Sequence, residues 1–314
     1  MPKKLATALF ALLSVAMGLL FLYSAFSKVV TVSSYETFRY TIVEYIHIPW
    51  IPAAILACFM IGIEFALAAL LILNIYGRRK WVAKSALALI IVFSVYLVYL
   101  WALMGDDVNC GCFGDAIWMS PSTSLIKNAI TAAVLLLLIK FHNGLRFRRD
   151  WIVILILGIA GVVSPFIMYP IPDSSPEWIK GKGFKLDLSS LYAPGKTDAP
   201  TTDLTKGKHV IAFVSLSCPH CQMAAYKMHV MKVKNPSLPF QLVYAGKDKY
   251  KAEFFKKSKA TNMPATRLDA DTFTGLVGWS WPVIYLVKDG WVVAKTTYVQ
   301  MDQGEIEKWL KQPW

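Results

Sequence analysis

The stretch Ser217-Cys218-Pro219-His220-Cys221 decides the fold of the second half of this chain. It follows an apolar run, residues 209–214, that predicts a buried strand, and it precedes residues 222–232, whose composition favours a helix. A Cys-x-x-Cys pair at a strand-to-helix junction is typical of a thiol–disulfide site. The first cysteine lies where unpaired backbone N–H groups and the helix dipole stabilise a thiolate. His220 adds a dipole or a charge, so we expect Cys218 to be acidic and to leave readily from a mixed disulfide.

The alternative for this pair is half of a zinc site. The sequence downstream shows no second Cys/His pair at ligand spacing, which favours redox chemistry. The tetrapeptide Cys218-Pro219-His220-Cys221 resembles the one found in the oxidising, DsbA-like members of the thioredoxin superfamily. The resemblance covers roughly the last 140 residues. It implies an α/β thioredoxin-like domain over residues 208–314.

Further elements downstream fit that resemblance. We expect one more strand at residues 240–245 and a solvated helix with a basic face at 249–260. A hairpin of strands 282–287 and 291–294 and a final helix at about 302–310 would follow. The predicted order, β-α-β-α-β-β-α, matches the thioredoxin fold.

Pro282 opens what we predict to be the third core strand. Thioredoxin relatives keep a cis-proline facing the active site at this point. A cis bond frees the backbone groups of the preceding residue to pair with an incoming peptide. Here that residue is Trp281, where relatives often carry a small or β-branched one, so we expect Trp281 to affect substrate shape or to shield the disulfide. An ordinary trans proline at a strand start is the alternative.

The composition predicts a membrane protein. The chain has 314 residues, enough for two domains, and 56% of them are apolar. The net charge of +13 does not require nucleic acid as a partner, because Lys and Arg cluster beside apolar runs, as topology signals do. The five cysteines form one pair at 218 and 221, a plausible pair at 110 and 112, and Cys58. This odd number fits catalytic dithiols better than a disulfide-stapled scaffold.

Five apolar runs predict helices that cross the membrane: residues 5–27, 51–76, 81–104, 125–141 and 151–169. We interpret the first as a retained helix rather than a signal peptide, because it is long and lacks an evident small-residue cleavage site. Residues 28–50 mix charged and aromatic side chains and predict an interfacial, partly helical segment.

Charge predicts the orientation of these spans. Basic segments at the N-terminus, 77–84 and 140–150 alternate with loops poor in Lys and Arg, which places the basic ones in the cytoplasm. Five spans then put residues 172–314 and the loop at 105–124 on the outer side. We therefore expect a five-pass protein of a bacterial inner membrane, in contact with lipid. Both dithiols would face the periplasm, where the thiols of extracytoplasmic proteins are the expected substrates.

The second dithiol lies in Asn109-Cys110-Gly111-Cys112-Phe113-Gly114. A disulfide across one residue closes a small, strained ring, so it should be relatively oxidising and easily reduced. The two glycines supply the backbone freedom that such a loop needs. Binding of copper(I) by two thiolates is the alternative.

A second resemblance rests on this loop. Four spans, Lys28 ending the first helix, Glu64 in the second and Cys110-Gly111-Cys112-Phe113-Gly114 before the fourth resemble the DoxX/MauE family. The MauE members are implicated, with a thioredoxin-like partner, in disulfide formation in methylamine dehydrogenase. The resemblance implies a four-helix membrane domain over residues 1–145. A fifth transmembrane helix (146–171) and a linker and lead-in (172–207) would follow.

Glu64 lies in the middle of its span, where a carboxylate is costly. It would relay protons to a bound quinone or pair with a cation, for which the candidates are Lys28, Arg39 and Lys127. Lys127, just after the cysteine loop, would lower a thiolate pKa or extend to the interface.

Other candidates surround the same region. Cys58 is expected to be a buried small residue or a third relay cysteine. Three aromatic residues near the outer face would line a quinone pocket or form an interfacial belt: Tyr96, Tyr99 and Trp101.

Together these patterns predict an all-α transmembrane four-helix bundle with a fifth transmembrane helix, followed by an α/β thioredoxin-like domain. The expected function is a membrane thiol–disulfide oxidoreductase. Substrate thiols would be oxidised by Cys218/Cys221, and electrons would pass through Cys110/Cys112 to a quinone. The alternatives are a reductase running the relay in reverse, a metal-handling protein using the Cys110/Cys112 pair, and a scaffold with a vestigial thioredoxin module.

Overall fold

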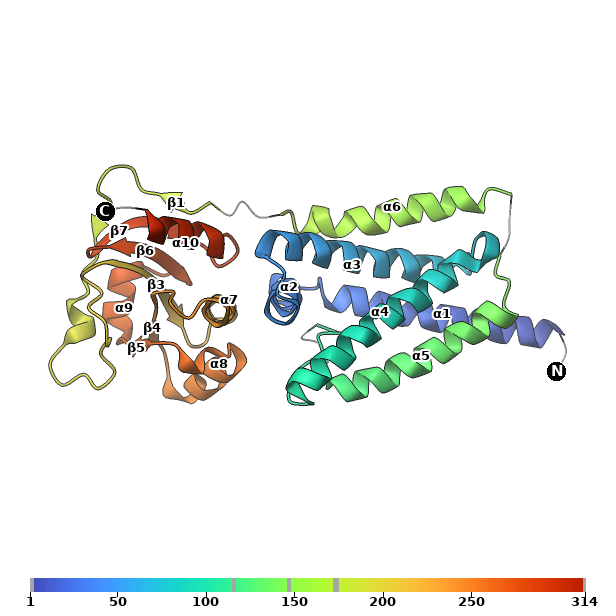
Figure 1. Cartoon of the computed structure of the whole chain (residues 1–314), viewed down its shortest axis with the longest axis horizontal. Helices are drawn as coiled ribbons and strands as arrows, with labels where there is room; N and C mark the ends of the chain where they lie inside the picture. Colours follow the sequence, from blue (N-terminus) through green and yellow to red (C-terminus); the bar gives the residue numbers. More distant parts are fainter. Residues whose placement is uncertain (1–2, 115–116, 146–147, 172–174, 313–314) are drawn as a thin grey trace. The chain divides into compact units, whose positions relative to one another are not determined.

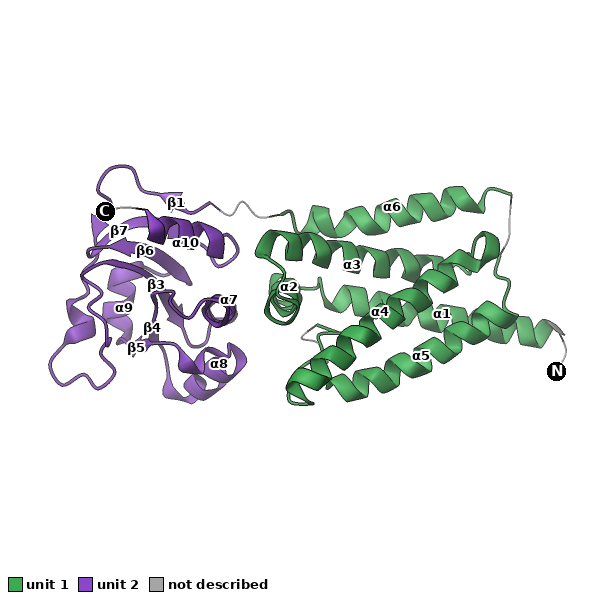
Figure 2. Cartoon of the chain, in the orientation of Figure 1, with its two compact units in different colours: residues 1–171 green, residues 172–314 purple. Residues whose placement is uncertain are grey.

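The computed structural model describes residues 3–114, 117–145, 148–171 and 175–312. The chain forms two compact units, residues 1–171 and 172–314 (Figure 2). The predicted boundaries at residues 146 and 172 fall outside the described residues. Each unit is considered by itself below.

The first unit is helical (Figure 1). It contains α1 (Lys3–Ser27), α2 (Val32–Ile46), α3 (Trp50–Ile72), α4 (Trp81–Met104), α5 (Pro121–Phe141) and α6 (Asp150–Met168). Among the described residues, five helices are long and apolar enough to cross a membrane, all of these except α2. The five predicted spans are therefore confirmed as helices. Helix α5 starts one turn earlier than its apolar run, because Ser120 caps it by accepting a hydrogen bond from the Thr123 N–H and Pro121 occupies its first turn.

Helix α2 lies across one end of the unit and packs on α3 (Figure 1). Most of its side chains are buried, including Glu36 and Arg39, which form an ion pair at 2.6 Å. The prediction of a partly helical segment is confirmed. Glu36 and Arg39 are nevertheless inside the protein, because they pair with each other within one turn.

Helices α3 and α6 pack closely through glycines. A Cβ atom at Gly62 would lie 2.6 Å from the Val162 Cα, and one at Gly161 would lie 2.7 Å from the Ala66 nitrogen. Small residues at such crossings let helix backbones approach inside a membrane. The fifth spanning helix is therefore an integral part of the helical unit.

The cysteine loop and the end of α6 lie at the same end of the helical unit. The Tyr169 hydroxyl, just after α6, donates a hydrogen bond to the Val29 carbonyl at 2.8 Å. In the cysteine loop, Gly114 lies against Ser27, whose carbonyl oxygen would be 2.9 Å from an added Cβ. The chain thus leaves this unit at the end that carries residues 105–114.

The basic segments after α3 and α5 meet at the other end. The Leu145 N–H donates to the Asn74 carbonyl at 2.7 Å, and the His142 ring lies 2.9 Å from the Asn74 side chain. The loops thus alternate between the two ends of the unit, as the charge pattern requires.

The second unit is built on one mixed sheet. Over residues 175–312 its strand order is β1-β7-β6-β3-β4-β5, with β2 also pairing with β7. The strands are β1 (Glu177–Trp178), β2 (Phe184–Lys185), β3 (Lys208–Ser215), β4 (Phe240–Ala245), β5 (Ala265–Arg267), β6 (Val283–Lys288) and β7 (Trp291–Thr296); the helices are α7 (Pro219–Lys234), α8 (Lys251–Lys257), α9 (Ala270–Val277) and α10 (Gln303–Lys311). The central β3 is parallel to β4 and antiparallel to β6, and α7 packs on β3. This topology is thioredoxin-like.

From β3 onward, two elements of this unit were not predicted, β5 and α9. Strand β5 has three residues and α9 has eight, too short for a periodic pattern. Asp269 begins α9 by accepting a hydrogen bond from the Thr272 N–H at 2.9 Å. The order is therefore β-α-β-α-β-α-β-β-α from β3 onward. Pro282 precedes the fourth strand of this series, so the expectation that it opens the third is wrong.

The lead-in before β3 packs onto the sheet. Within it, Phe184–Lys185 forms the short strand β2, after which the side chains of Leu186, Leu188 and Leu191 enter the core. Gly183 adopts a φ of 74°, and a Cβ there would collide with the Val292 carbonyl oxygen.

Candidate functional site

Cys218 sits at the N-cap of α7. Strand β3 ends at Ser215, and the chain turns so that the Cys218 side chain accepts a hydrogen bond from the Cys221 N–H at 3.3 Å. Pro219 fills the first position of the helix, where a missing N–H is harmless. The sulfur thus occupies the place of a capping oxygen, in the field of the helix N-terminus.

The two cysteines of this motif differ in acidity. The pKa of Cys218 is lowered to about 6, first by a hydrogen bond from the Cys221 side chain, then by the N–H groups of Cys221 and His220 and by the His220 charge. Cys221 is fully buried and accepts a hydrogen bond from the Ser215 N–H at 3.2 Å. Burial raises the pKa of Cys221 far above its usual range. Cys218 is therefore the accessible, acidic thiol of the pair, and Cys221 is the protected, weakly acidic one.

His220 and Lys227 attach α7 to the segment before α10. The exposed His220 ring places Nδ1 3.0 Å from the Tyr298 hydroxyl. Lys227 is buried, and its Nζ donates to the carbonyls of Tyr298 and Val299 at 2.7 and 3.0 Å. Neither Lys227 nor Tyr298 belongs to a local motif, and sequence reasoning missed both.

The backbone of Trp281 faces the Cys218 sulfur. The Trp281–Pro282 peptide bond is cis, as expected. The Trp281 carbonyl oxygen lies 3.9 Å from the Cys218 sulfur. The indole packs against Phe273 at 5.6 Å between centroids and donates from Nε1 to the Gly278 carbonyl at 3.0 Å. It is therefore the carbonyl of Trp281, rather than its ring, that contacts Cys218.

The second pair lies in the loop between α4 and α5. The buried Cys110 sulfur is 2.9 Å from the Ser124 hydroxyl and accepts from the Cys112 N–H at 3.3 Å, across Gly111 with a φ of 70°. The pKa of Cys110 is lowered to about 6, chiefly by a hydrogen bond from the Cys112 side chain and also by Ser124 and the Lys127 charge. The same hydrogen bond, together with burial, raises the pKa of Cys112. This loop therefore also pairs an acidic thiol with a neutral one.

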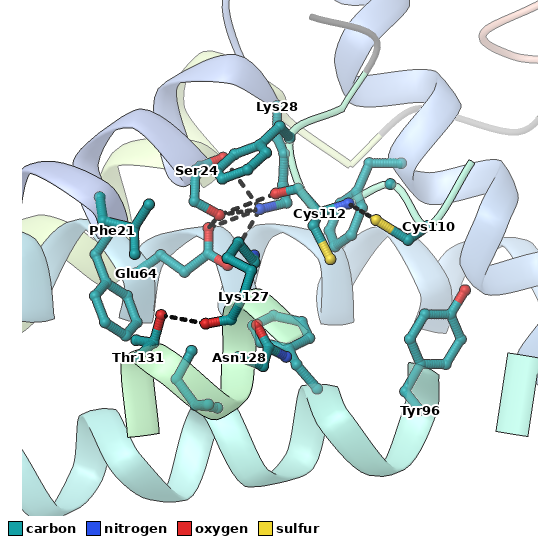
Figure 3. Close-up of a pocket in the computed structure, with 16 residues that line it drawn as sticks. Phe21, Ser24, Lys28, Glu64, Tyr96, Cys110, Cys112, Lys127, Asn128 and Thr131 are labelled. Atoms are coloured by element: carbon teal, nitrogen blue, oxygen red, sulfur yellow. Dashed lines mark hydrogen bonds and ion pairs between the residues drawn. The ribbon is translucent and has the colours of Figure 1, made fainter. Parts of the chain in front are cut away.

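A buried polar network lies under this loop (Figure 3). Lys28 and Glu64 form an ion pair at 2.9 Å. Lys28 Nζ also donates to the Ser24 hydroxyl at 2.8 Å, and that hydroxyl lies 3.2 Å from the Glu64 carboxylate and 3.0 Å from the Cys112 carbonyl oxygen. Of the partners considered for Glu64, Lys28 is the one found. Arg39 pairs with Glu36 instead.

A pocket opens beside these groups. It is lined by polar side chains of α1, α3, α4, α5 and the cysteine loop, and by aromatic ones: Ser24, Lys28, Glu64, Tyr96, Cys110, Cys112, Lys127, Asn128 and Thr131, with Phe21, Phe38, Phe93 and Phe113. Lys127 faces this pocket, its Nζ 4.6 Å from the centroid of the Phe113 ring, rather than extending to the interface (Figure 3).

The structure does not bring all of the predicted aromatic residues to this pocket. Tyr96 lines it, but Tyr99 and Trp101 do not and are 45% and 49% exposed. The hypothesis that Tyr99 and Trp101 line the pocket needs correction. Trp101 follows Tyr96 by five positions, which places it on another face of α4.

Cys58 does not line the pocket either. Its sulfur is fully buried, 3.3 Å from the Tyr35 hydroxyl. Among the described residues, no three His, Cys, Asp or Glu side chains gather as a metal site. The polar pocket residues that the sequence did not single out, Ser24, Asn128 and Thr131, lie on apolar helices, and only the packing of those helices brings them to the pocket.

Comparisons with known proteins agree with this architecture. Residues 6–141 match the family model of methylamine utilisation protein MauE. Protein TlpB of Flavobacterium psychrophilum is 25% identical over 244 residues, which cover 64% of this chain and 66% of that protein. The chain thus spans just under two thirds of the length of this relative.

Two solved structures are also similar. A thioredoxin domain of a thiol-disulfide oxidoreductase from Bacteroides vulgatus aligns over 35% of this chain and 83% of its own, with 15% identity and a TM-score of 0.29. A secreted Mycobacterium tuberculosis disulfide oxidoreductase, described as homologous to E. coli DsbE, aligns over 33% of this chain and 80% of its own, with 21% identity and a TM-score of 0.27.

The helical topology, the cysteine loop before α5 and the family match agree with one another. Residues 6–141 of this membrane protein therefore form a MauE-family domain, to which the chain joins a thioredoxin-like domain.

Proposed function

We propose that this protein oxidises thiols of extracytoplasmic proteins to disulfides. In this proposal Cys218/Cys221 reacts with the substrate, and Cys110/Cys112 passes the electrons to a membrane quinone. The observation that carries the proposal is the asymmetry at α7: an acidic, half-exposed Cys218 at the helix N-cap and a buried, weakly acidic Cys221 behind it.

The exchange begins at the exposed sulfur. A substrate thiolate attacks Cys218 of the Cys218–Cys221 disulfide, and Cys221 leaves with the electron pair of the broken bond and takes up a proton. A second substrate thiol then attacks the mixed disulfide, so that the substrate disulfide forms and Cys218 leaves as a thiolate. Two electrons have moved from the substrate to the Cys218/Cys221 pair.

The stabilised thiolate favours this direction. Whatever stabilises the Cys218 thiolate stabilises the reduced form of the pair and makes its disulfide a stronger oxidant. The reduced pair is then reoxidised by the Cys110–Cys112 disulfide. Because both pairs belong to one chain, tethering gives each an effective concentration of about millimolar at the other.

The expected location is the bacterial inner membrane, with the N-terminus in the cytoplasm. The basic segments at residues 77–84 and 140–150 support this orientation. The cysteine loop and the end of α6 share one end of the helical unit, so both dithiols would work on the periplasmic side of the membrane.

Anaerobic mixing tests the proposal. The reduced full-length protein is mixed with a short-chain quinone, and the thiol state of each pair is followed by alkylation and mass spectrometry. We expect oxidation to appear at Cys110/Cys112 first and then at Cys218/Cys221. The Cys112→Ser variant should keep Cys218/Cys221 reduced. If that variant is oxidised as fast as the wild type, the relay is refuted.

A trapping experiment tests the substrate step. In Cys221→Ser the resolving thiol is lost, so Cys218 should accumulate mixed disulfides with extracytoplasmic proteins. Cys218→Ser is the matched control and should trap none. If the measured potentials of both pairs lie below those of client disulfides, electrons run the other way and the protein is a reductase.

A further inference from the structure

The pocket beneath the cysteine loop contains a buried acceptor without a partner. Asn128 on α5 is 2% exposed. Its Nδ2 donates to the Ser94 hydroxyl at 3.1 Å, and that hydroxyl donates its own hydrogen to the Ile90 carbonyl at 2.7 Å. Ser94 must therefore accept from Asn128, which fixes the orientation of the amide. The Asn128 Oδ1 is left with no hydrogen-bond partner among the described residues.

Such an atom indicates a ligand. A buried acceptor without a donor costs about 1–3 kcal/mol, and native proteins rarely keep one without a reason. Asn128 lines the same pocket as the two loop cysteines, and Figure 3 shows its side chain below the Cys112 sulfur. A ligand hydroxyl placed there would supply the missing hydrogen bond.

Two hydrogen-bond donors face the same space. The Tyr96 hydroxyl is buried without a partner among the described residues. The Lys127 ammonium lies over the Phe113 ring, and in the described part of the chain no carboxylate pairs with it, whereas Lys28 is paired with Glu64. The pocket therefore offers donors, an acceptor and one uncompensated positive charge.

The walls between these groups are aromatic. Phe21, Phe93 and Phe113 line the pocket, which lies among helices long enough to span the membrane. A flat apolar ring suits such walls. The polar groups require that this ring carry oxygens able both to accept and to donate hydrogen bonds.

We propose that this pocket binds a quinone, with Lys127 and Asn128 as its polar contacts and the Cys110/Cys112 pair at its edge. The inference rests on the proposed function and identifies the place where its electron acceptor binds. A quinone oxygen is a carbonyl that accepts from Lys127 or Tyr96. After reduction it is a hydroxyl that donates to Asn128. The pocket thus has a partner for each state of the ring.

The electron transfer balances without another reactant. Two S–H bonds break at Cys110 and Cys112, and one S–S bond forms between them. Two electrons and two protons pass to the ring oxygens, which converts the quinone to a quinol. The positive charge of Lys127 stabilises the negative charge that develops on the ring before it is protonated.

Binding of a short-chain quinone to the full-length protein in detergent tests this inference. Lys127→Gln and Asn128→Leu should each weaken binding about tenfold, the effect of one lost hydrogen bond. The matched controls are Lys140→Gln, on the same helix but outside the pocket, and the exposed Asn143→Leu; both should bind as the wild type does. If the quinone does not bind, or binds the pocket variants with unchanged affinity, the inference is overturned.

Thermal unfolding without quinone separates a binding role from a structural one. Asn128→Leu removes an unpartnered acceptor along with the hydrogen bond to Ser94, two effects that oppose each other, so the ligand-free variant should be about as stable as the wild type while its quinone affinity falls. A fall in both would assign Asn128 a structural role and overturn its assignment here.

Exchange of Cys218/Cys221 with a model dithiol peptide is measured in the same samples. It needs no quinone. Loss of quinone binding with exchange intact refutes the pocket but not the thiol chemistry of the proposed function. Quinone binding without any exchange refutes the thiol chemistry but not the pocket.

Discussion

Replacing Cys221 with alanine should raise the pKa of Cys218 more than replacing His220 does. The largest cause of the low pKa, about 6, is the hydrogen bond from the Cys221 side chain, and the His220 charge is a smaller one. At pH 7 a thiol with a pKa of 6 is about 90% thiolate, whereas one with an ordinary pKa near 8.5 is about 3% thiolate. Full loss of the stabilisation would therefore slow alkylation of Cys218 at pH 7 by about thirtyfold. Cys221→Ala should produce much of this loss.

The pH dependence has a definite sign. The folded pKa of Cys218 is depressed, so the thiolate stabilises the reduced, folded protein above the ordinary thiol pKa near 8.5. This contribution is lost as the pH falls from there through about 6. Reactivity of the folded protein titrates at the folded pKa near 6, because only the thiolate attacks.

The assay is the rate of iodoacetamide labelling at Cys218, read by mass spectrometry of its peptide. The pH runs from about 4 to about 9, a range that includes both the lowered pKa of Cys218 and the ordinary thiol pKa. The wild-type midpoint should lie near 6. Tyr298→Phe removes the hydroxyl that contacts His220 and serves as a control, with a midpoint close to that of the wild type. The reasoning is refuted if the wild type titrates near 8.5, or if His220→Ala moves the midpoint further than Cys221→Ala.

Three further outcomes are expected. Glu64→Gln leaves Lys28 buried without its counter-charge and should lower the unfolding free energy of the helical unit by about 3–5 kcal/mol in detergent. The double variant Lys28→Met/Glu64→Leu should recover most of this loss. If Glu64→Gln is as stable as the wild type, the prediction is contradicted. Trp279 is 83% exposed and lies two residues before Trp281, whose carbonyl contacts Cys218. Trp279→Ser should therefore slow oxidation of a protein client but not of a small thiol. Equal effects on the two substrates would show that Trp279 makes no client contact. Lys227→Met removes two hydrogen bonds to the carbonyls of residues 298 and 299 and should destabilise that segment by about 1–3 kcal/mol. The measurement is amide hydrogen exchange over residues 298–301, which should become faster. Unchanged exchange would count against the prediction.

The sequence predicts the features that depend on neighbours along the chain. An apolar run of sufficient length is enough to predict a spanning helix, and all five are found. The Cys-x-x-Cys motif after an apolar run predicts a strand, a turn and a helix, because capping by Cys218 is a local interaction. The cis peptide bond before Pro282 follows from the resemblance to thioredoxin-like proteins rather than from any local pattern.

Features that depend on how helices and strands pack are harder to predict from the sequence. Composition identifies Glu64 as a buried carboxylate in need of a partner, but only the packing of α1 on α3 selects Lys28 over Arg39. Asn128 is one polar residue on an apolar helix, and nothing in the sequence shows that its amide faces the cysteine loop. Strand β5 is held in place by pairing with β4, so its three residues carry no signal of their own.

The hydroxyl of Ser24 links the ion pair to the cysteine loop, and it has one hydrogen for two acceptors. Lys28 already donates to this oxygen, so its hydrogen can go either to the Glu64 carboxylate or to the Cys112 carbonyl. A disulfide between Cys110 and Cys112 would close a small ring next to this carbonyl. A shift of that carbonyl would turn the hydrogen toward the carboxylate. This single rotor would then report the oxidation state of the loop to the charged interior of the bundle without any displacement of a helix.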